Sequence, residues 1–120
     1  IILWPLDPQA YIPGLARAKE AGIPSILINS PMDAAANEFI VSFTGPDVYQ
    51  EGEMAADSLN AAMGGKGSVV IIAGQAGNGT TIGRVDGFVD QLAKIGSEIV
   101  VLDTVNADFD QQKALVVSRD

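Results

Sequence analysis

Short apolar runs rich in β-branched residues alternate along the chain with stretches of helical periodicity. The clearest runs read SILIN (25–29), SVVIIAG (68–74) and SEIVVLD (97–103). Helical patterns cover residues 11–22, 47–63 and 81–95, and a last one begins near Asp110. Continuous apolar runs of this length are typical of strands buried on both faces. Since strands separated by helices pair in parallel through right-handed crossovers, the alternation predicts an α/β fold with parallel sheets and flanking helices.

The stretch between residues 30 and 47 interrupts this alternation. SILIN is followed by a loop of small and polar residues (30–37) and then by another strand candidate, FIVSF (39–43), with no helix between them. The sequence TGPD then marks a turn, and Asp47 is a suitable N-cap for the next helix. The interruption predicts that one domain ends and another begins in this stretch.

Polar and aromatic residues follow the predicted strands. In an open parallel sheet, ligands bind beyond the carboxyl ends of the strands. The residues at these positions are Trp4, Asn29, Ser30, Thr44, Gln75 and residues 103–110. Most of them are aromatics or uncharged hydrogen-bonding groups, so the set suits a neutral polyol better than an anion.

The loop GQAGNG (74–79) has three glycines in six positions and admits two interpretations. A dinucleotide-binding loop needs G-x-G-x-x-G/A, with an acidic residue about 20 positions further on. Gly77 and Gly79 match this pattern, but Ile82 occupies the third position. Asp103 stands where the acidic residue is required. The alternative is a turn that uses the positive φ available to glycine, while a P-loop is excluded because no G-K-[ST] follows.

Arg84 stands in the first turn of the helix predicted after this loop, on the edge of its apolar stripe. A cation there opposes the helix dipole, because the dipole favours negative charge at a helix N-terminus. The position therefore lowers the stability of the helix, which indicates a functional role for Arg84. An arginine at the mouth of a sheet donates several hydrogen bonds in a fixed plane, which suits ring and hydroxyl oxygens. The alternative is a surface salt bridge with Asp86 or Glu53.

Two aromatic residues also admit two interpretations. Phe109 follows a predicted strand among polar residues, where it either packs on the next helical turn or forms a flat wall for the apolar face of a sugar ring. Trp4 lies in an apolar run and either joins the core or forms such a wall.

The helix predicted over residues 47–63 contains Gly52, which costs roughly 1 kcal/mol relative to alanine and therefore predicts a close backbone contact. The acidic pairs Glu51/Glu53 and Asp108/Asp110 are predicted to be solvated surface.

Composition excludes several classes of function. Fifteen acidic and seven basic residues give a formal net charge of −8, and the basic residues are scattered, so nucleic acid is not an expected partner. Cysteine and histidine are both absent, which removes the usual zinc, haem, thiol and Ser-His chemistries. A metal site could therefore use only carboxylates. We expect no metal site, no cofactor and no catalysis. No run approaches the roughly 18 apolar residues of a membrane span, so direct membrane insertion is not expected either.

Four stretches follow one another in a distinctive order. They are AKEAGIPSILIN, GPDVYQEGEMAADSL, GGKGSVVIIAGQAGNGTTIGRVDGF and ADFDQQKAL. The most specific features are a G-K-G before a strand, a G-x-x-G loop after it and R-x-x-G-F in the following helix. In this order and spacing the stretches resemble the sugar-binding periplasmic proteins of ABC transporters, of the ribose-binding type. The resemblance extends over nearly all 120 residues and implies a Rossmann-like fold, the periplasmic binding protein type 1 fold.

The resemblance implies a set of ligand-binding residues. Arg84 would bond sugar hydroxyls, Phe109 would pack on the sugar ring, and Gln75 would face the cleft between two lobes. Asn29 falls where the family usually has an aspartate, and Trp4 falls where a polar residue is common. These two departures concern the identity of the sugar and leave the fold unaffected. The full expected set is Trp4, Asn29, Ser30, Gln75, Arg84 and Phe109.

The resemblance also divides the chain into parts of two lobes. Residues 1–44 would belong to the N-terminal lobe and residues 45–120 would begin the C-terminal lobe, with a hinge crossing near residues 44–47. The chain opens on an apolar run and closes on a helical pattern without a stop signal, so we expect a segment of a longer protein.

By this resemblance, the intact protein would bind a monosaccharide or related polyol between its lobes and deliver it to an ABC permease. It would be periplasmic or lipid-anchored outside the cytoplasm. The effector-binding core of a LacI-type transcription regulator shares the fold and is the alternative. The isolated segment is expected to bind sugar no tighter than millimolar, because half a cleft falls short of the roughly 8 kcal/mol that micromolar affinity requires. Exposed sheet edges also predict a homodimer of the segment.

Overall fold

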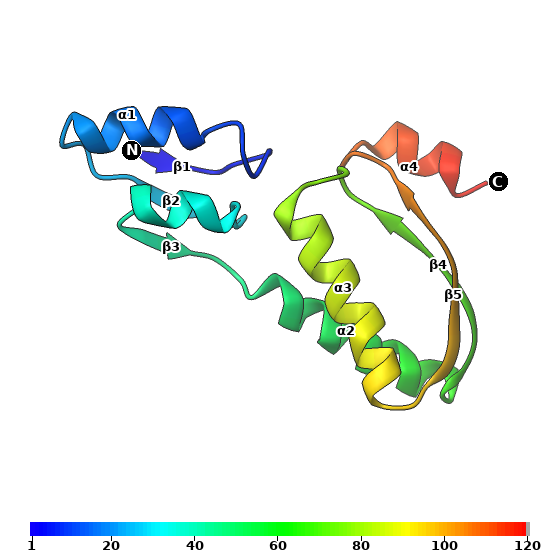
Figure 1. Cartoon of the computed structure of the whole chain (residues 1–120). Coiled ribbons are helices and arrows are strands. Elements are labelled where there is room, and N and C mark those ends of the chain that lie inside the picture. Colours follow the sequence, from blue (N-terminus) through cyan, green and yellow to red (C-terminus); the bar gives the residue numbers. More distant parts are fainter. Residues whose placement is uncertain (120) are drawn as a thin grey trace. The chain divides into compact units, whose positions relative to one another are not determined.

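The computed structural model describes residues 1–119, which form parallel sheets with flanking helices (Figure 1). The chain divides into two units, of which the first comprises Ile1–Pro46 with Gly77–Thr80, and the second comprises Asp47–Ala76 and the chain from Thr81 onward. Each unit has its own parallel sheet, so the predicted α/β class is confirmed. Within the described residues, no helix is both long enough and apolar enough to cross a membrane.

The first unit carries a three-stranded parallel sheet in the order β1-β2-β3. Its elements are β1 (Ile2–Leu3), α1 (Ile12–Glu20), β2 (Ile26–Ile28), the 3₁₀ helix η1 (Ala34–Phe39) and β3 (Ser42–Thr44). Leu27 of the central strand, Leu15 of α1 and Ala36 of η1 are buried. These three residues contribute to the apolar interior of the unit.

The segment between β2 and β3 differs from the prediction. A 3₁₀ helix occupies Ala34–Phe39, where the sequence predicts a loop followed by a strand from residue 39. Asp33 begins this helix by accepting a hydrogen bond of 2.9 Å from the Ala35 N–H, and β3 starts only at Ser42. The Asp33 cap thus favours a helical turn in the alanine-rich residues that follow it, and the strand begins later than predicted.

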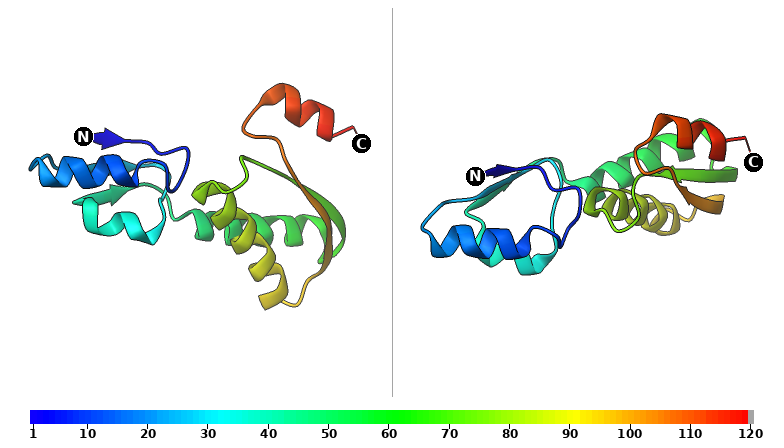
Figure 2. Two further views of the ribbon diagram at one scale, coloured as in Figure 1. Left: turned by 45° about the horizontal axis from the view of Figure 1, so that its top comes forward. Right: turned by 90° about the horizontal axis from the view of Figure 1, so that it is seen from above.

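The second unit pairs two long parallel strands, β4 (Lys66–Ala73) and β5 (Glu98–Asn106), which run side by side in both views of Figure 2. Its helices are α2 (Val48–Met63), α3 (Gly79–Lys94), whose first two residues belong to the first unit, and α4 (Gln111–Val117). Ala56, Leu92 and Ile99 form its buried cluster. The sequence predicts that Asp103 ends the strand β5. Because β5 extends to Asn106, Asp103 lies inside the strand instead.

Helices α2 and α3 approach each other closely at two glycines. A Cβ added to Gly52 would lie 2.3 Å from the carbonyl oxygen of Arg84, and a Cβ added to Gly87 would lie 2.1 Å from that of Tyr49. The opposing atoms belong to the backbone, so no side-chain rotation relieves either clash. The predicted close contact at Gly52 is confirmed, and it brings the backbone of Arg84 against α2.

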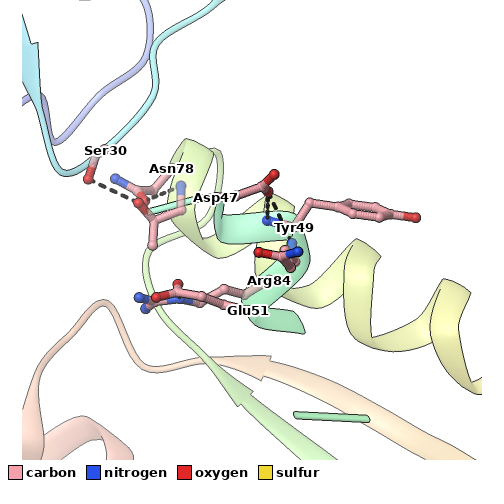
Figure 3. Close-up of polar contacts among 8 residues, drawn as sticks. Ser30, Asp47, Tyr49, Glu51, Asn78 and Arg84 are labelled. Atoms are coloured by element: carbon pink, nitrogen blue, oxygen red, sulfur yellow. Dashed lines mark hydrogen bonds and ion pairs between the residues drawn. The ribbon is translucent and has the colours of Figure 1, made fainter. Parts of the chain in front are cut away.

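Aspartate side chains cap two helices of this unit. Asp47 accepts hydrogen bonds of 3.1 Å from the N–H groups of Tyr49 and Gln50, so the predicted N-cap of α2 is confirmed (Figure 3). Asp110 accepts a bond of 2.7 Å from the Lys113 N–H at the start of α4. Asp110 therefore has a structural role as well as an exposed position.

Candidate functional site

A cavity of about 900 Å³ opens in the second unit beside β4. Its walls come from α2, β4, α3 and the segment that leads into α4. Most of the lining side chains are apolar, and the charged ones are Glu51, Arg84 and Asp110. Arg84 and Phe109, two residues of the predicted set, both line this cavity.

Gly74, the first glycine of the loop GQAGNG, makes room for the Phe109 ring. A Cβ on Gly74 would lie 2.2 Å from Cε1 of Phe109 and 2.6 Å from Oγ1 of Thr81. The backbone joins the same segments, because the Ala107 N–H donates to the Ala73 carbonyl at 2.8 Å. This first glycine therefore allows an aromatic ring to lie over the end of β4.

The other two glycines of the loop have different roles. Gly77 has a φ of +79° with open space around it, so it serves as a turn residue. A Cβ on Gly79 would lie 2.7 Å from the Pro31 carbonyl oxygen, which requires a residue without a side chain. Asp103, the acidic residue that the dinucleotide interpretation requires, accepts a bond of 2.7 Å from the neighbouring Thr104 N–H within β5. The dinucleotide interpretation is wrong on this point, since no acidic residue ends the strand.

Phe109 adopts a backbone conformation that bulky residues rarely adopt. Its φ is +58°, and Asp108 before it has a φ of +54°. The ring is 58% exposed, so burial does not compensate for the strain. Left-handed backbone at a bulky residue costs of the order of 1–3 kcal/mol and is concentrated at functional sites.

Arg84 makes an ion pair, but with a partner that the sequence does not indicate. Its Nε donates to Oε2 of Glu51 at 2.8 Å (Figure 3). Glu53 pairs instead with Lys94 at 3.3 Å. The predicted alternative partners of Arg84, Asp86 and Glu53, are both wrong. The two Nη groups of Arg84 make no hydrogen bond to the described residues, so four N–H donors stay available to a ligand.

Trp4 and Ser30 contact each other in the first unit. The Trp4 Nε1–H donates to the Ser30 hydroxyl at 3.1 Å, and the Thr80 hydroxyl bonds to the same oxygen at 3.0 Å. Ser30 is 4% exposed, whereas the Trp4 ring is 59% exposed. Ser30 therefore orients the indole, and of the two interpretations of Trp4 the one that places it in the core is wrong.

Asn78 anchors this network from the start of α3. Its Oδ1 accepts a bond of 3.0 Å from the Thr80 N–H (Figure 3). Its Nδ2 donates to the Leu6 carbonyl at 2.7 Å. Asn78 thus has the bonding pattern of a helix N-cap, a signal that was visible in the sequence.

Asn29 and Gln75 complete the predicted set. Asn29 has a φ of +65°, and its N–H donates to the Thr44 carbonyl at 2.9 Å, while its exposed amide makes no hydrogen bond within residues 1–119. Gln75 is exposed in the bend after β4 and is not among the residues that line the cavity. The structure therefore groups Trp4 with Ser30 and Arg84 with Phe109, and it leaves Asn29 and Gln75 outside both groups.

Glu51 is the residue of this region that sequence reasoning missed. It was predicted to be solvated surface, yet it lines the cavity and bonds to Arg84. The two residues are 33 positions apart, so no local pattern signals their contact. Among residues 1–119, no group of three or more acidic side chains is arranged to hold a metal ion.

Residues 1–119 match the family described as periplasmic binding protein domain. The xylitol-binding protein of Mycolicibacterium smegmatis is 30% identical to the chain over 115 residues, which are 92% of this chain and 31% of that protein. This relative is named for the binding of a polyol.

Two solved structures are similar over almost the whole chain. An ABC transporter solute-binding protein from Agrobacterium vitis with bound D-fucose has a TM-score of 0.92 and 31% identity, covering 98% of this chain and 40% of its own. One from Actinobacillus succinogenes 130z with bound D-allose has a TM-score of 0.84 and 31% identity, covering 98% and 42%. The chain therefore spans less than half the length of these relatives. They are solute-binding proteins, and they give no support to the transcription-regulator alternative.

Proposed function

The chain belongs to the periplasmic binding protein domain family, and we propose that it is a segment of the solute-binding component of an ABC sugar importer, with a monosaccharide or related polyol as ligand. The observation that carries the proposal is the presence, in one cavity, of a guanidinium with unused donors and an exposed aromatic ring on strained backbone. The names of the relatives, which mention xylitol, D-fucose and D-allose, support this class of ligand.

Arg84 and Phe109 have complementary roles in this proposal. The Nη groups of Arg84 donate to hydroxyl oxygens of the sugar in a fixed plane. The ring of Phe109 packs against the apolar C–H face of the sugar. This combination of polar edge and apolar face matches the surface of a pyranose or an extended polyol.

The first unit supplies the remaining proposed contacts. The exposed Trp4 ring provides a second flat apolar surface, and the exposed Asn29 amide provides both donors and an acceptor. Ser30 orients Trp4 and contributes only indirectly, because its hydroxyl is buried and already bonded. Gln75 stays a proposed contact on the basis of the resemblance alone.

The remaining parts of the proposal concern the whole protein. We place residues 1–44 in an N-terminal lobe and residues 45–120 in a C-terminal lobe, with the sugar bound in the cleft between them and then delivered to an ABC permease. The family description and the transporter relatives support a periplasmic or lipid-anchored extracytoplasmic location and a binding rather than a catalytic role.

A titration of the isotopically labelled 120-residue chain with xylitol, D-fucose and D-allose, followed by NMR, tests the proposal. We expect the signals of Arg84 and Phe109 to shift, with no saturation below millimolar sugar. Replacing Arg84→Gln removes the charged donors and should weaken binding about tenfold, while Arg17→Gln in α1 is the matched control and should change nothing. The proposal fails if none of the three sugars moves either signal, or if both arginine variants behave alike.

We also propose that the isolated chain forms homodimers. Val70, Ile72, Val100 and Leu102 of β4 and β5 are exposed, and two-stranded sheets with free edges tend to pair. Sedimentation over a range of concentrations tests this, and a monomer at every concentration would refute it.

A further inference from the structure

The charged residues that line the cavity of the second unit are one cation and two carboxylates. They are Arg84, Glu51 and Asp110. Taken together, the lining therefore has one more negative than positive charge, even though an arginine is the proposed sugar ligand. The whole chain adds to this field with its net charge of −8. A ligand that enters the cavity meets a negative environment with a single guanidinium in it.

Glu51 uses one specific part of that guanidinium. Its Oε2 accepts from Nε of Arg84 at 2.8 Å and leaves both Nη groups unbonded within the described residues. Glu51 lies in the first turn of α2, where a negative charge is favourable, and Asp47 caps the same helix. The carboxylate is thus fixed beside the guanidinium and does not depend on a bound ligand for its position.

We infer that Glu51 determines the charge preference of the site, because it fixes the guanidinium of Arg84 and repels anions, so that the site accepts neutral polyols and disfavours sugar acids. The inference rests on the proposed function, in which Arg84 binds the sugar. A sugar carboxylate has two ways to reach Arg84. It either displaces Glu51 from Nε or lies beside Glu51 at the Nη groups, and in both cases two like charges come close together.

The size of the effect follows from the exposure of the pair. The side chains of Arg84 and Glu51 are 50% and 40% exposed, so water and salt screen the repulsion. We therefore expect Glu51 to change the preference between a neutral and an anionic sugar by about threefold to tenfold.

The test compares D-fucose with D-galacturonate, which have the same ring configuration and differ only in a methyl or a carboxylate group at C6. Each is titrated at neutral pH by NMR into the 120-residue chain and into the variant Glu51→Gln, which keeps the shape and an acceptor for Nε but removes the charge. We expect the ratio of the two affinities to move toward D-galacturonate by about threefold to tenfold in the variant. The variant Glu53→Gln is the matched control, because Glu53 lies on the same helix, bonds to Lys94 and does not line the cavity.

A second readout separates positioning from charge. The Nε–H signal of Arg84 should be sharp in the unsubstituted chain, stay visible in Glu51→Gln and broaden in Glu51→Ala, which removes the acceptor. If D-fucose shifts neither Arg84 nor Phe109 in the unsubstituted chain, the proposed function fails and the inference fails with it. If D-fucose binds but Glu51→Gln leaves the ratio unchanged, or Glu53→Gln changes it equally, the inference alone is overturned.

Discussion

The two units fix their exposed aromatic residues by different means. In the first unit, the Trp4 ring is held through its N–H by the hydroxyl of Ser30, which Thr80 also bonds. In the second unit, Phe109 has no polar atom in its side chain. Its ring lies where the missing Cβ of Gly74 leaves room, on backbone in the left-handed region.

This contrast shows where each unit is vulnerable. An aromatic residue held by hydrogen bonds is disturbed by the loss of a hydroxyl group, because the partners are then left unpaired. An aromatic residue placed by close packing is disturbed by the gain of a methyl group, because dense packing leaves no space for it. The first unit is therefore expected to be sensitive to deletions at its polar network, and the second to additions at its glycines.

The largest expected effect comes from adding one methyl group to the second unit. Gly52→Ala would bring a Cβ to 2.3 Å from the Arg84 carbonyl oxygen, which forces α2 and α3 apart. We expect the free energy of unfolding, measured by urea denaturation with circular dichroism, to fall by about 3 kcal/mol. The matched control is Gly14→Ala in α1, where the nearest atom, Nη2 of Arg17, is 3.9 Å away. That variant should be as stable as the original chain or about 0.5 kcal/mol more stable. An equal loss of stability in both variants would show that the second unit is not the more sensitive to an added methyl group.

A smaller loss is expected from deleting one hydroxyl group in the first unit. Ser30→Ala removes the acceptor of Trp4 Nε1–H and the partner of Thr80, at a cost of about 1–2 kcal/mol. Since Trp4 is the only tryptophan, its fluorescence anisotropy reports directly on the freedom of the ring and should decrease. Ser58→Ala, which deletes an exposed hydroxyl bonded to the Met54 carbonyl, should change stability by less than about 0.5 kcal/mol. An unchanged anisotropy in Ser30→Ala would mean that the hydrogen bond does not fix the indole.

The sequence contains enough information for most of the fold, because the signals involved are local. Apolar runs predict the strands, Asp47 and Asp110 mark helix starts by their capping chemistry, and Gly52 reveals a close contact by its cost inside a helix. The 3₁₀ helix at Ala34–Phe39 was missed because its small and polar residues match the composition of a loop. The signal that could have indicated it is the capping residue Asp33 followed by three alanines, Ala34–Ala36.

The contacts of the candidate site could not be predicted in the same way, because they join residues far apart in the chain. Ser30 meets Trp4 across 26 positions and Thr80 across 50, while Glu51 meets Arg84 across 33. The residue types at the strand ends predict which side chains are candidates for ligand binding. Which of them bond to one another depends on the packing of separate elements, which a single sequence does not specify.

Replacing Phe109 by glycine and by alanine tests whether its backbone conformation is strained. Both variants lose the ring, so the difference between them isolates the cost of a φ of +58°. At an ordinary position glycine is the less stable of the two, whereas here we expect Phe109→Gly to be more stable than Phe109→Ala by about 1 kcal/mol. The same two replacements at Leu115, an exposed helical residue of α4, should give the ordinary order. If the order at Phe109 is also ordinary, the strain in the second unit is not real.

The smallest expected effect is the response of each unit to pH, beginning with acid. In the first unit, the backbone N–H of Gln9 donates to Asp7 at 2.8 Å and lowers the pKa of that carboxyl below 3.8. The N–H of Ala35 lowers the pKa of Asp33 in the same way. Folding therefore favours the ionised carboxylates, and this stabilisation is full above pH 3.8 and is lost as the pH falls through the lower folded values.

In the second unit the titrating group with a shifted pKa responds to alkali. The Tyr49 hydroxyl donates to Oδ2 of Asp90 at 2.8 Å, and this bond raises the pKa of Tyr49 above 10.0. Folding favours the neutral phenol, so the stabilisation is full below pH 10.0 and is lost as the pH rises through the folded value. Methyl NMR signals assigned to each unit should thus show the first unit weakening in acid and the second in alkali. Asp7→Asn should remove only part of the acid response, because Asp33 also contributes to it, whereas Tyr49→Phe should remove the alkaline response. If acid and alkali each change the signals of both units together, the two units unfold as one. The contrast between them then concerns local structure only.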